Sequence, residues 1–238
     1  MENNNGTIYT KLVNKSVLKR KVYHNTFEVF KEFKMVADLI RFEAEQKLTH
    51  DELPFKVEFR DKGEFECELR FSGDSLIFTM HTNVFEFSRV HEVMKTPYVI
   101  EDPERSYCGV IHIYNFLADS FRYNRMNDIG YLVARVFINK ERFFLVEGKH
   151  QTKFYYNQFM GEPISQQAMR DIIESAMRYS LDFDLLVPPY DLIKETSVSD
   201  MMENSFNMKV RTAKRLGFKF QADHDQHETR QHGGDCRA

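Results

Sequence analysis

The stretch from Phe121 to His150, FRYNRMNDIGYLVARVFINKERFFLVEGKH, decides the fold of this chain. Two apolar runs, about 130–138 and 142–149, flank the polar segment Asn139-Lys140-Glu141-Arg142, which is typical of a hairpin turn. Because both alternating faces of these runs are mostly apolar, we predict a central β-hairpin that is covered on both sides.

The register of this hairpin places charge on an apolar face. With a two-residue turn at Lys140-Glu141, Ala134 lies opposite Glu147, and Glu147 shares its face with Lys149. Arg135 falls on the other face in this register. Charged residues on an apolar face indicate either a structural ion pair or a working site.

Outward from the hairpin, the chain predicts more strands and two long helices. Alternating residues over about 55–87 predict an antiparallel meander, and the apolar run 107–116 predicts another strand. Helical spacing predicts a helix over about 27–47, begun at Asn25 or Thr26, and a second over 165–181. The fold class is therefore α+β, with an antiparallel or mixed multi-stranded sheet packed against these helices.

The second helix has a clear buried stripe. Ser165 is suited to its N-cap, and the apolar face is predicted to hold Met169, Ile172, Ile173, Ala176 and Ser180. In the meander, by contrast, Glu64, Glu66 and Glu68 alternate with apolar residues, so we interpret them as a solvated strand face and not as a metal cluster.

The chain is expected to have four parts. Residues 1–24 read as an N-terminal arm, 25–190 as the main α+β domain, 191–220 as a helical extension and 221–238 as a disordered tail. The extension contains two predicted helices, about 199–205 and 209–216, and the second is basic. This pair is compatible with a degenerate helix-turn-helix that binds DNA.

Composition limits the function classes. The chain has 22 Phe, 11 Tyr and no Trp, which favours an aromatic-rich sheet core. A net charge of -3 gives no general attraction to nucleic acid or to an anionic membrane, so nucleic acid is a disfavoured partner and a membrane is not expected. Three scattered cysteines, no apolar leader and no segment of membrane-spanning length predict a cytoplasmic protein. A homo-oligomer is compatible with the sequence.

Asp128 precedes the first hairpin strand, and Glu147-Gly148-Lys149 closes the second. This arrangement resembles the D…ExK element of the PD-(D/E)xK nuclease superfamily. The resemblance implies that Asp128 and Glu147 hold Mg²⁺ while Lys149 positions the attacking water, the chemistry of a metal-dependent phosphodiesterase. It covers residues 128–149, and Asn127 stands where the family usually has proline.

The loop before the hairpin carries a candidate recognition surface. Arg122 and Arg125 are suited to clamp a phosphate or carboxylate, Tyr123 to stack on a ligand, and Asn124 to donate hydrogen bonds. The alternative is a structural loop, held by pairs between these arginines and Asp119 or Asp128.

No complete catalytic constellation is present in the sequence. A glycine-rich phosphate loop, GxSxG, CxxC and an EF-hand loop are all missing, and a cofactor is implied only by the nuclease alternative, as Mg²⁺. The leading hypothesis is a soluble cytoplasmic binding or protein-interaction domain without catalysis. The nuclease and the helix-turn-helix are the alternatives.

Overall fold

The computed structural model describes residues 4–48, 56–126, 128–148, 159, 161–182, 190–199 and 201–202. The chain divides into two units, residues 1–118 with 129–184 and residues 119–128 with 185–238.

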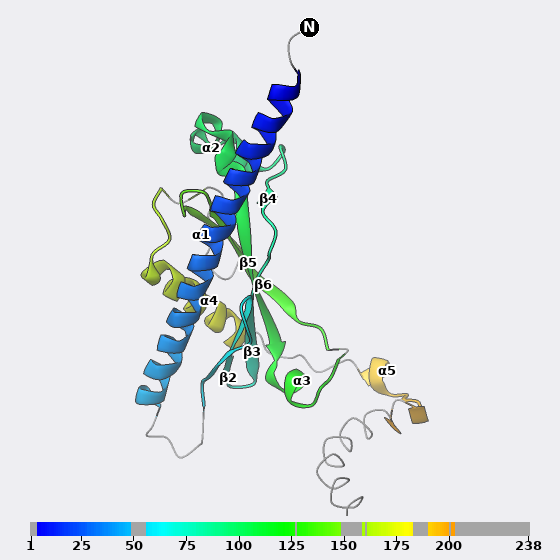
Figure 1. Ribbon diagram of the computed structural model, residues 1–238. Helices are drawn as coiled ribbons and strands as arrows, with labels where there is room; N and C mark the ends of the chain where they lie inside the picture. The colour runs from blue at the N-terminus through cyan, green and yellow to red at the C-terminus, as the bar shows by residue number, and fades with distance from the viewer. Residues whose placement is uncertain are drawn as a thin grey trace, which may run out of the picture. The chain divides into compact units, whose positions relative to one another are not determined.

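An antiparallel sheet forms the centre of the first unit. Its strands follow the order β1-β2-β3-β5-β6-β7, and β4 also pairs with β5 (Figure 1). The strands are β1 (Glu58–Asp61), β2 (Glu66–Phe71), β3 (Asp74–Met80), β4 (Phe85–Glu86), β5 (Tyr107–Leu117), β6 (Tyr131–Asn139) and β7 (Phe144–Gly148). The α+β class with an antiparallel sheet is thereby confirmed.

Strands β3 and β4 share one edge of β5. Cys108 pairs with Asn139 of β6 on one side and with Phe85 of β4 on the other, while β3 pairs with β5 from Ile111 onward. The chain therefore leaves the sheet after Met80 and returns to the same edge at Phe85.

Two long helices cover one face of the sheet, and shorter helices lie in the connections (Figure 1). The helices are α1 (Asn4–Lys47), η1 (Glu92–Lys95), α2 (Pro97–Glu101), η2 (Pro103–Ser106), α3 (Ala118–Arg122), α4 (Gln166–Leu181) and α5 (Tyr190–Ile193). The stripe predicted for α4 is buried at all five positions, and the Ser165 side chain caps the helix by accepting a hydrogen bond from the Ala168 amide. The N-cap and the buried face of α4 are thus confirmed.

Helix α1 begins much earlier than the sequence predicted. It starts at Asn4, where an arm over residues 1–24 was expected, and Thr26 lies inside the helix with its hydroxyl bonded to the Val22 carbonyl. Leu18 and Val22 are buried with Tyr107, so tertiary packing stabilises the additional turns. The prediction of a helix start at Asn25 or Thr26 was wrong because packing outweighs a local capping signal.

The sheet is covered on both faces. Its helix side carries the larger core, with Phe30 and Phe33 of α1 against strand residues such as Phe78. The other side has a smaller core under η1 and α2, formed by Val93, Val99, Cys108, Val110, Phe137, Leu145 and Phe159. This second core accounts for the two apolar faces of the hairpin.

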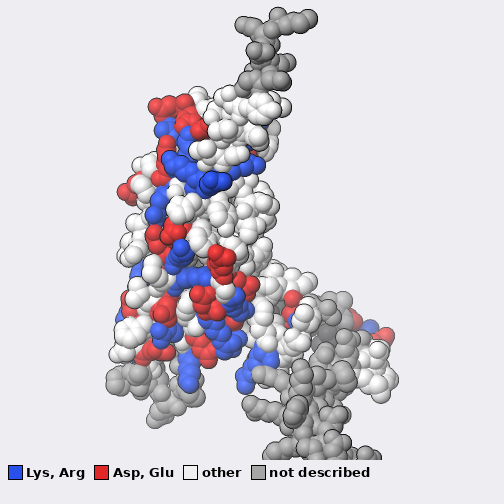
Figure 2. Space-filling model, viewed as in Figure 1, with Lys and Arg blue, Asp and Glu red and all other residues white. Residues whose placement is uncertain are grey.

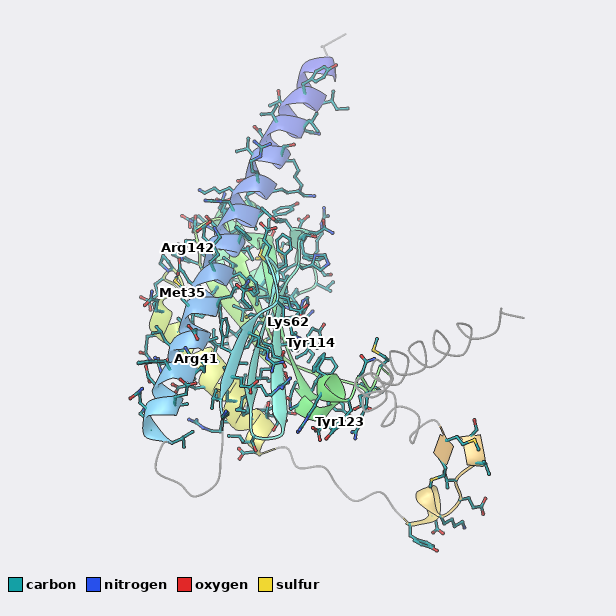
Figure 3. The ribbon with its side chains drawn as sticks, turned by 60° about the horizontal axis from the view of Figure 1, so that its bottom comes forward. Met35, Arg41, Lys62, Tyr114, Tyr123 and Arg142 are labelled. Carbon is teal, nitrogen blue, oxygen red and sulfur yellow. The ribbon has the colours of Figure 1, made fainter. Side chains whose placement is uncertain are left out.

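Glu68 departs from the predicted solvated acidic face. Its side chain is 1% exposed and its carboxylate accepts hydrogen bonds from Ser75 at 2.6 Å and Arg70 at 3.1 Å. Lys62, labelled in Figure 3, lies 3.2 Å from the other carboxylate oxygen. Burial alone would raise the pKa of the Glu68 carboxyl, but the Ser75 hydroxyl, Lys62 and Arg70 together outweigh burial and lower it.

Replacing Glu68 with glutamine is expected to lower the free energy of unfolding by about 1–3 kcal/mol at neutral pH, because charged hydrogen bonds in a buried site are lost. A lowered pKa in the folded state means that this stabilisation is present above the ordinary carboxyl pKa and is lost as pH falls through the folded value. Urea unfolding at a series of pH values should therefore show a flatter acid limb for Glu68→Gln than for the wild type.

Glu66→Gln is the matched control for this experiment. Glu66 lies on the same strand, but its side chain is 42% exposed, so its removal should change stability by less than about 0.5 kcal/mol. Equal stability of the Glu68 variant and the wild type at neutral pH would contradict the prediction.

Candidate functional site

A pocket of about 270 Å³ opens on the sheet face that α1 and α4 do not cover. Its floor comes from three adjacent strands, and its wall is the segment 85–91, where the chain has returned to the edge of β5. The lining residues are Phe85, Glu86, Phe87, Ser88, His91, Cys108, Val110, His112, Arg135, Phe137 and Glu147. All of them belong to the first unit.

The polar floor of the pocket is a row across the sheet. His112 of β5 is the register partner of Arg135 of β6, and Arg135 is the register partner of Glu147 of β7. Side chains directly opposite one another project to the same face of a sheet. Three ionisable groups therefore stand side by side where the neighbouring floor residues are mostly apolar.

Glu147 is held by two donors. Arg135 Nη2 donates to Glu147 Oε2, and His91 Nε2 lies 3.2 Å from Glu147 Oε1. The other ring nitrogen of His91, Nδ1, accepts a hydrogen bond from the Val93 amide at 3.2 Å. The ring proton is therefore on Nε2, which donates to Glu147, and both nitrogens of His91 are engaged.

These contacts correct the register predicted for the hairpin. The structure pairs Ala134 with Gly148 and Arg135 with Glu147, so Arg135 lies on the face of Glu147 and not on the opposite face. The hairpin closes through the three residues 140–142, and Arg142 adopts a left-handed conformation with φ of 63°. A three-residue loop with its last residue in this conformation shifts the register by one position relative to a two-residue turn.

The D…ExK set stays a prediction. Glu147 lies in the pocket, but Asp128 belongs to the second unit and Lys149 lies outside the described residues. Within the second unit, Asp128 accepts a hydrogen bond from the Ser120 hydroxyl at 2.5 Å and lies 4.0 Å from Arg125.

The predicted recognition loop has an ordered core of its own. The guanidinium groups of Arg122 and Arg125 each lie 5.5 Å from the centre of the Tyr123 ring, which is labelled in Figure 3. Both cations therefore contact the same aromatic side chain. Asn124 has a φ of 53°, and the Arg125 amide donates to the Ser120 carbonyl, an arrangement that ends α3. Asn124 thus has a structural role, and ligand binding by these four residues stays a prediction.

Aromatic rings form the apolar part of the pocket. The ring of Phe87 lies 4.9 Å from Phe137 and 4.7 Å from His91, measured between ring centres. The Arg135 guanidinium lies 5.2 Å from the centre of the Phe137 ring. A planar apolar body of a few ring atoms is the kind of group that such walls accommodate.

His112 and Arg135 retain unused hydrogen-bonding capacity. Within the described part of the chain, Nη2 is the one nitrogen of Arg135 with a hydrogen-bond partner, and neither ring nitrogen of His112 has one. Burial lowers the pKa of His112, and the nearby charges of Arg135 and His81 lower it further. Its imidazole is therefore neutral at physiological pH and can donate through one nitrogen and accept through the other.

The other ionisable groups of the pocket are occupied or inert. The carboxylate of Glu86 accepts a hydrogen bond from the Tyr107 hydroxyl. Burial raises the pKa of the Cys108 thiol, which keeps it protonated and unreactive. Among the ranges that the structure describes, no group of three or more His, Cys, Asp and Glu residues is arranged to hold a metal ion.

Sequence reasoning missed His91, His112 and Arg135. A usable signal was present for two of them, because His112 interrupts the apolar run YCGVIHIYNF and Arg135 interrupts YLVARVFIN. A single polar residue inside a central strand indicates a structural or functional demand at that position. His91 carried no such signal, since only the path of the chain after β4 brings it to Glu147.

The charge on the face in view is mixed in sign. Figure 2 shows Lys and Arg mixed with Asp and Glu over the lower half of the face in view, whereas a nucleic-acid surface gathers cations. The basic helix predicted at 209–216 lies outside the described residues. No helix within the described residues has the length and apolar character needed to span a membrane.

Comparison of this chain with protein-family models, with curated proteins and with solved structures found no match.

Proposed function

We propose that this chain is a non-catalytic binding protein whose pocket holds a small anion with an aromatic or planar apolar body. The observation that carries the proposal is the unused hydrogen-bonding capacity of Arg135 and His112 on the floor of a pocket walled by phenylalanine rings. A pocket of this size accommodates a small molecule and not an extended chain.

The polar groups favour an anion over a cation. Both oxygens of Glu147 already accept hydrogen bonds, and Glu86 accepts one from Tyr107. Arg135 still offers N–H groups in the fork geometry that suits a carboxylate or phosphate. Because Glu147 holds the guanidinium in place, little rotamer freedom is lost when a ligand binds.

The engagement of His91 supports binding without catalysis. A general base needs a free nitrogen that can reach the proton of a substrate, and both nitrogens of His91 are used for positioning. His112 has free nitrogens, but within the described residues no carboxylate orients its ring.

The proposal of a cytoplasmic location is supported by Cys67 and Cys108, which are buried free thiols compatible with a reducing compartment.

Phenylacetate is a suitable probe, with benzylamine as its cationic counterpart of similar shape. We expect phenylacetate to perturb the amide signals of β5, β6 and β7 in a two-dimensional NMR titration and to bind at least about tenfold more tightly than benzylamine. Arg135→Gln should weaken phenylacetate binding about tenfold to a hundredfold, because a charge-assisted hydrogen bond is lost.

Arg60→Gln provides the control for this titration. Arg60 is an arginine on β1 whose side chain is 50% exposed and pairs with Glu58 outside the pocket, so its removal should leave the affinity unchanged. Equal binding of benzylamine and phenylacetate, or an Arg135→Gln protein that binds as the wild type does, would refute the proposal. The absence of any perturbation by phenylacetate would refute the ligand class.

A further inference from the structure

The outer side of α1 carries an exposed stripe that is apolar at its two ends and polar in its middle. Six large apolar side chains on this stripe are each about half exposed or more: Tyr9, Val13 and Val17 near the start of the helix, and Met35, Leu39 and Phe42 near its end. Ile8 and Leu12 are also exposed and lie one position beside the stripe. Successive positions of the stripe are separated by four, four and three residues in turn. The positions between its two apolar ends are occupied by Arg20, His24, Glu28 and Lys31. Such an eleven-residue repeat keeps all ten positions on one face of a helix.

This stripe points away from the body of the protein. Val17 and Met35 are eighteen residues apart in the sequence, which equals five helical turns, so they lie on the same side of α1. Phe33, two residues before Met35, lies on the opposite side and is buried against the sheet. Figure 1 shows that the first turns of α1 extend beyond the sheet, and Met35 is labelled in Figure 3.

The stripe is symmetric about residue 26. Val13 and Leu39 are equally distant from that position, as are Val17 and Met35, and Tyr9 and Phe42 nearly so. His24 and Glu28 are also related in this way. A two-fold axis through the helix at residue 26 would therefore place each apolar group of one copy against an apolar group of the other, and each His24 against a Glu28. The same axis places Arg20 of one copy near Lys31 of the other.

The charges of α1 favour this antiparallel arrangement. From Asn4 to Asn25 the helix carries Lys11, Lys15, Lys19, Arg20 and Lys21 and no acidic residue. All acidic residues of α1 are in its second half, at Glu28, Glu32, Asp38, Glu43 and Glu45. A parallel pair would place the five cations of one copy beside those of the other. An antiparallel pair places them beside the second half of α1, where these five carboxylates stand together with Lys31, Lys34, Arg41 and Lys47.

We propose that two copies of this chain form a homodimer through the outer stripes of their α1 helices, packed antiparallel about residue 26. The sheet-facing side of each helix is opposite to the stripe, so the two bodies lie on the outside of the helix pair. About ten side chains per copy form the contact, fewer than the roughly 20–30 residues on each side of a standard interface.

Sedimentation velocity over a range of protein concentrations tests the dimer with the full-length chain. Val13→Glu and Leu39→Glu should each weaken dimerisation at least tenfold, because each places a carboxylate in the apolar part of the contact. Asn14→Glu is the control, since it adds the same charge at an exposed position beside the stripe and should leave the dimer intact. Far-ultraviolet circular dichroism verifies that each variant remains folded.

Disulfide cross-linking in a Cys236→Ser background tests the orientation. His24→Cys lies next to the proposed two-fold axis and should cross-link to its own copy under mild oxidation. Val13→Cys should not, because antiparallel packing separates the two residues by about 39 Å along the helix. A wild-type protein that is monomeric at high concentration, a Val13→Glu protein that still dimerises, or self-cross-linking of Val13→Cys would each overturn the proposal.

Discussion

Gly109→Ala is expected to lower the free energy of unfolding by about 2–4 kcal/mol, one of the two largest effects that the structure predicts. Gly109 lies in β5 directly beneath α1. A Cβ atom at this position would stand 2.1 Å from Thr26 Oγ1 and 2.7 Å from Thr26 Cβ. Thr26 is fully buried, so the helix must move away from the sheet to accommodate one added methyl group.

Urea unfolding measures this effect, and two further variants identify its cause. Gly161→Ala is the control, because a Cβ there meets nothing within 4 Å and stability should change by less than about 0.5 kcal/mol. Thr26→Gly removes the clashing atoms, so the double variant with Gly109→Ala should be more stable than the sum of the single effects predicts. Additive effects would show that the close contact between α1 and β5 is not the cause.

Asn139→Ala is expected to cost about 2–4 kcal/mol, because this buried side chain organises the hairpin turn. Asn139 Oδ1 accepts hydrogen bonds from the amides of Glu141 and Phe143 at 2.9 and 3.0 Å. Its Nδ2 donates to the Tyr98 hydroxyl at 2.8 Å, and Tyr98 donates in turn to Glu141 at 2.6 Å. Alanine would leave two backbone donors of the turn without these partners.

Asn25→Ala is the comparison variant for this prediction. Asn25 of α1 donates to the carbonyls of Asn139 and Lys140 but holds no backbone donor of the turn, so its loss should cost about 1 kcal/mol. Thermal and urea unfolding of the two variants give the comparison. An Asn139→Ala protein that is as stable as Asn25→Ala would show that the turn does not depend on the Asn139 side chain.

The turn around Asn139 also explains why the sequence mispredicted the floor of the pocket. A two-residue and a three-residue loop are both compatible with Asn139-Lys140-Glu141-Arg142, and they differ by one position of register. Arg142, labelled in Figure 3, takes the left-handed conformation while its guanidinium reaches Glu32 of α1 at 2.8 Å. A contact between residues so far apart in sequence leaves no local pattern from which to choose the register.

The sequence by itself determined the elements whose stability depends on local periodicity. Alternation predicted the meander and the hairpin, and helical spacing with the Ser165 cap predicted α4. These patterns can be recognised in the sequence because side chains alternate between the two faces of a strand and recur every 3.6 residues on one face of a helix. The spacing of apolar residues therefore shows which face is buried.

Three features were determined only by the tertiary structure: the residue at which α1 begins, the burial of Glu68, and the set of residues that meet at the pocket. Leu18 and Val22 extend α1 because Tyr107 packs against them, and Glu68 is buried because Lys62, Arg70 and Ser75 surround its carboxylate. His91 reaches Glu147 because the chain returns to the edge of β5 after β3 has ended. Each of these outcomes depends on contacts between distant segments, which the order of residues specifies only once the whole chain has folded.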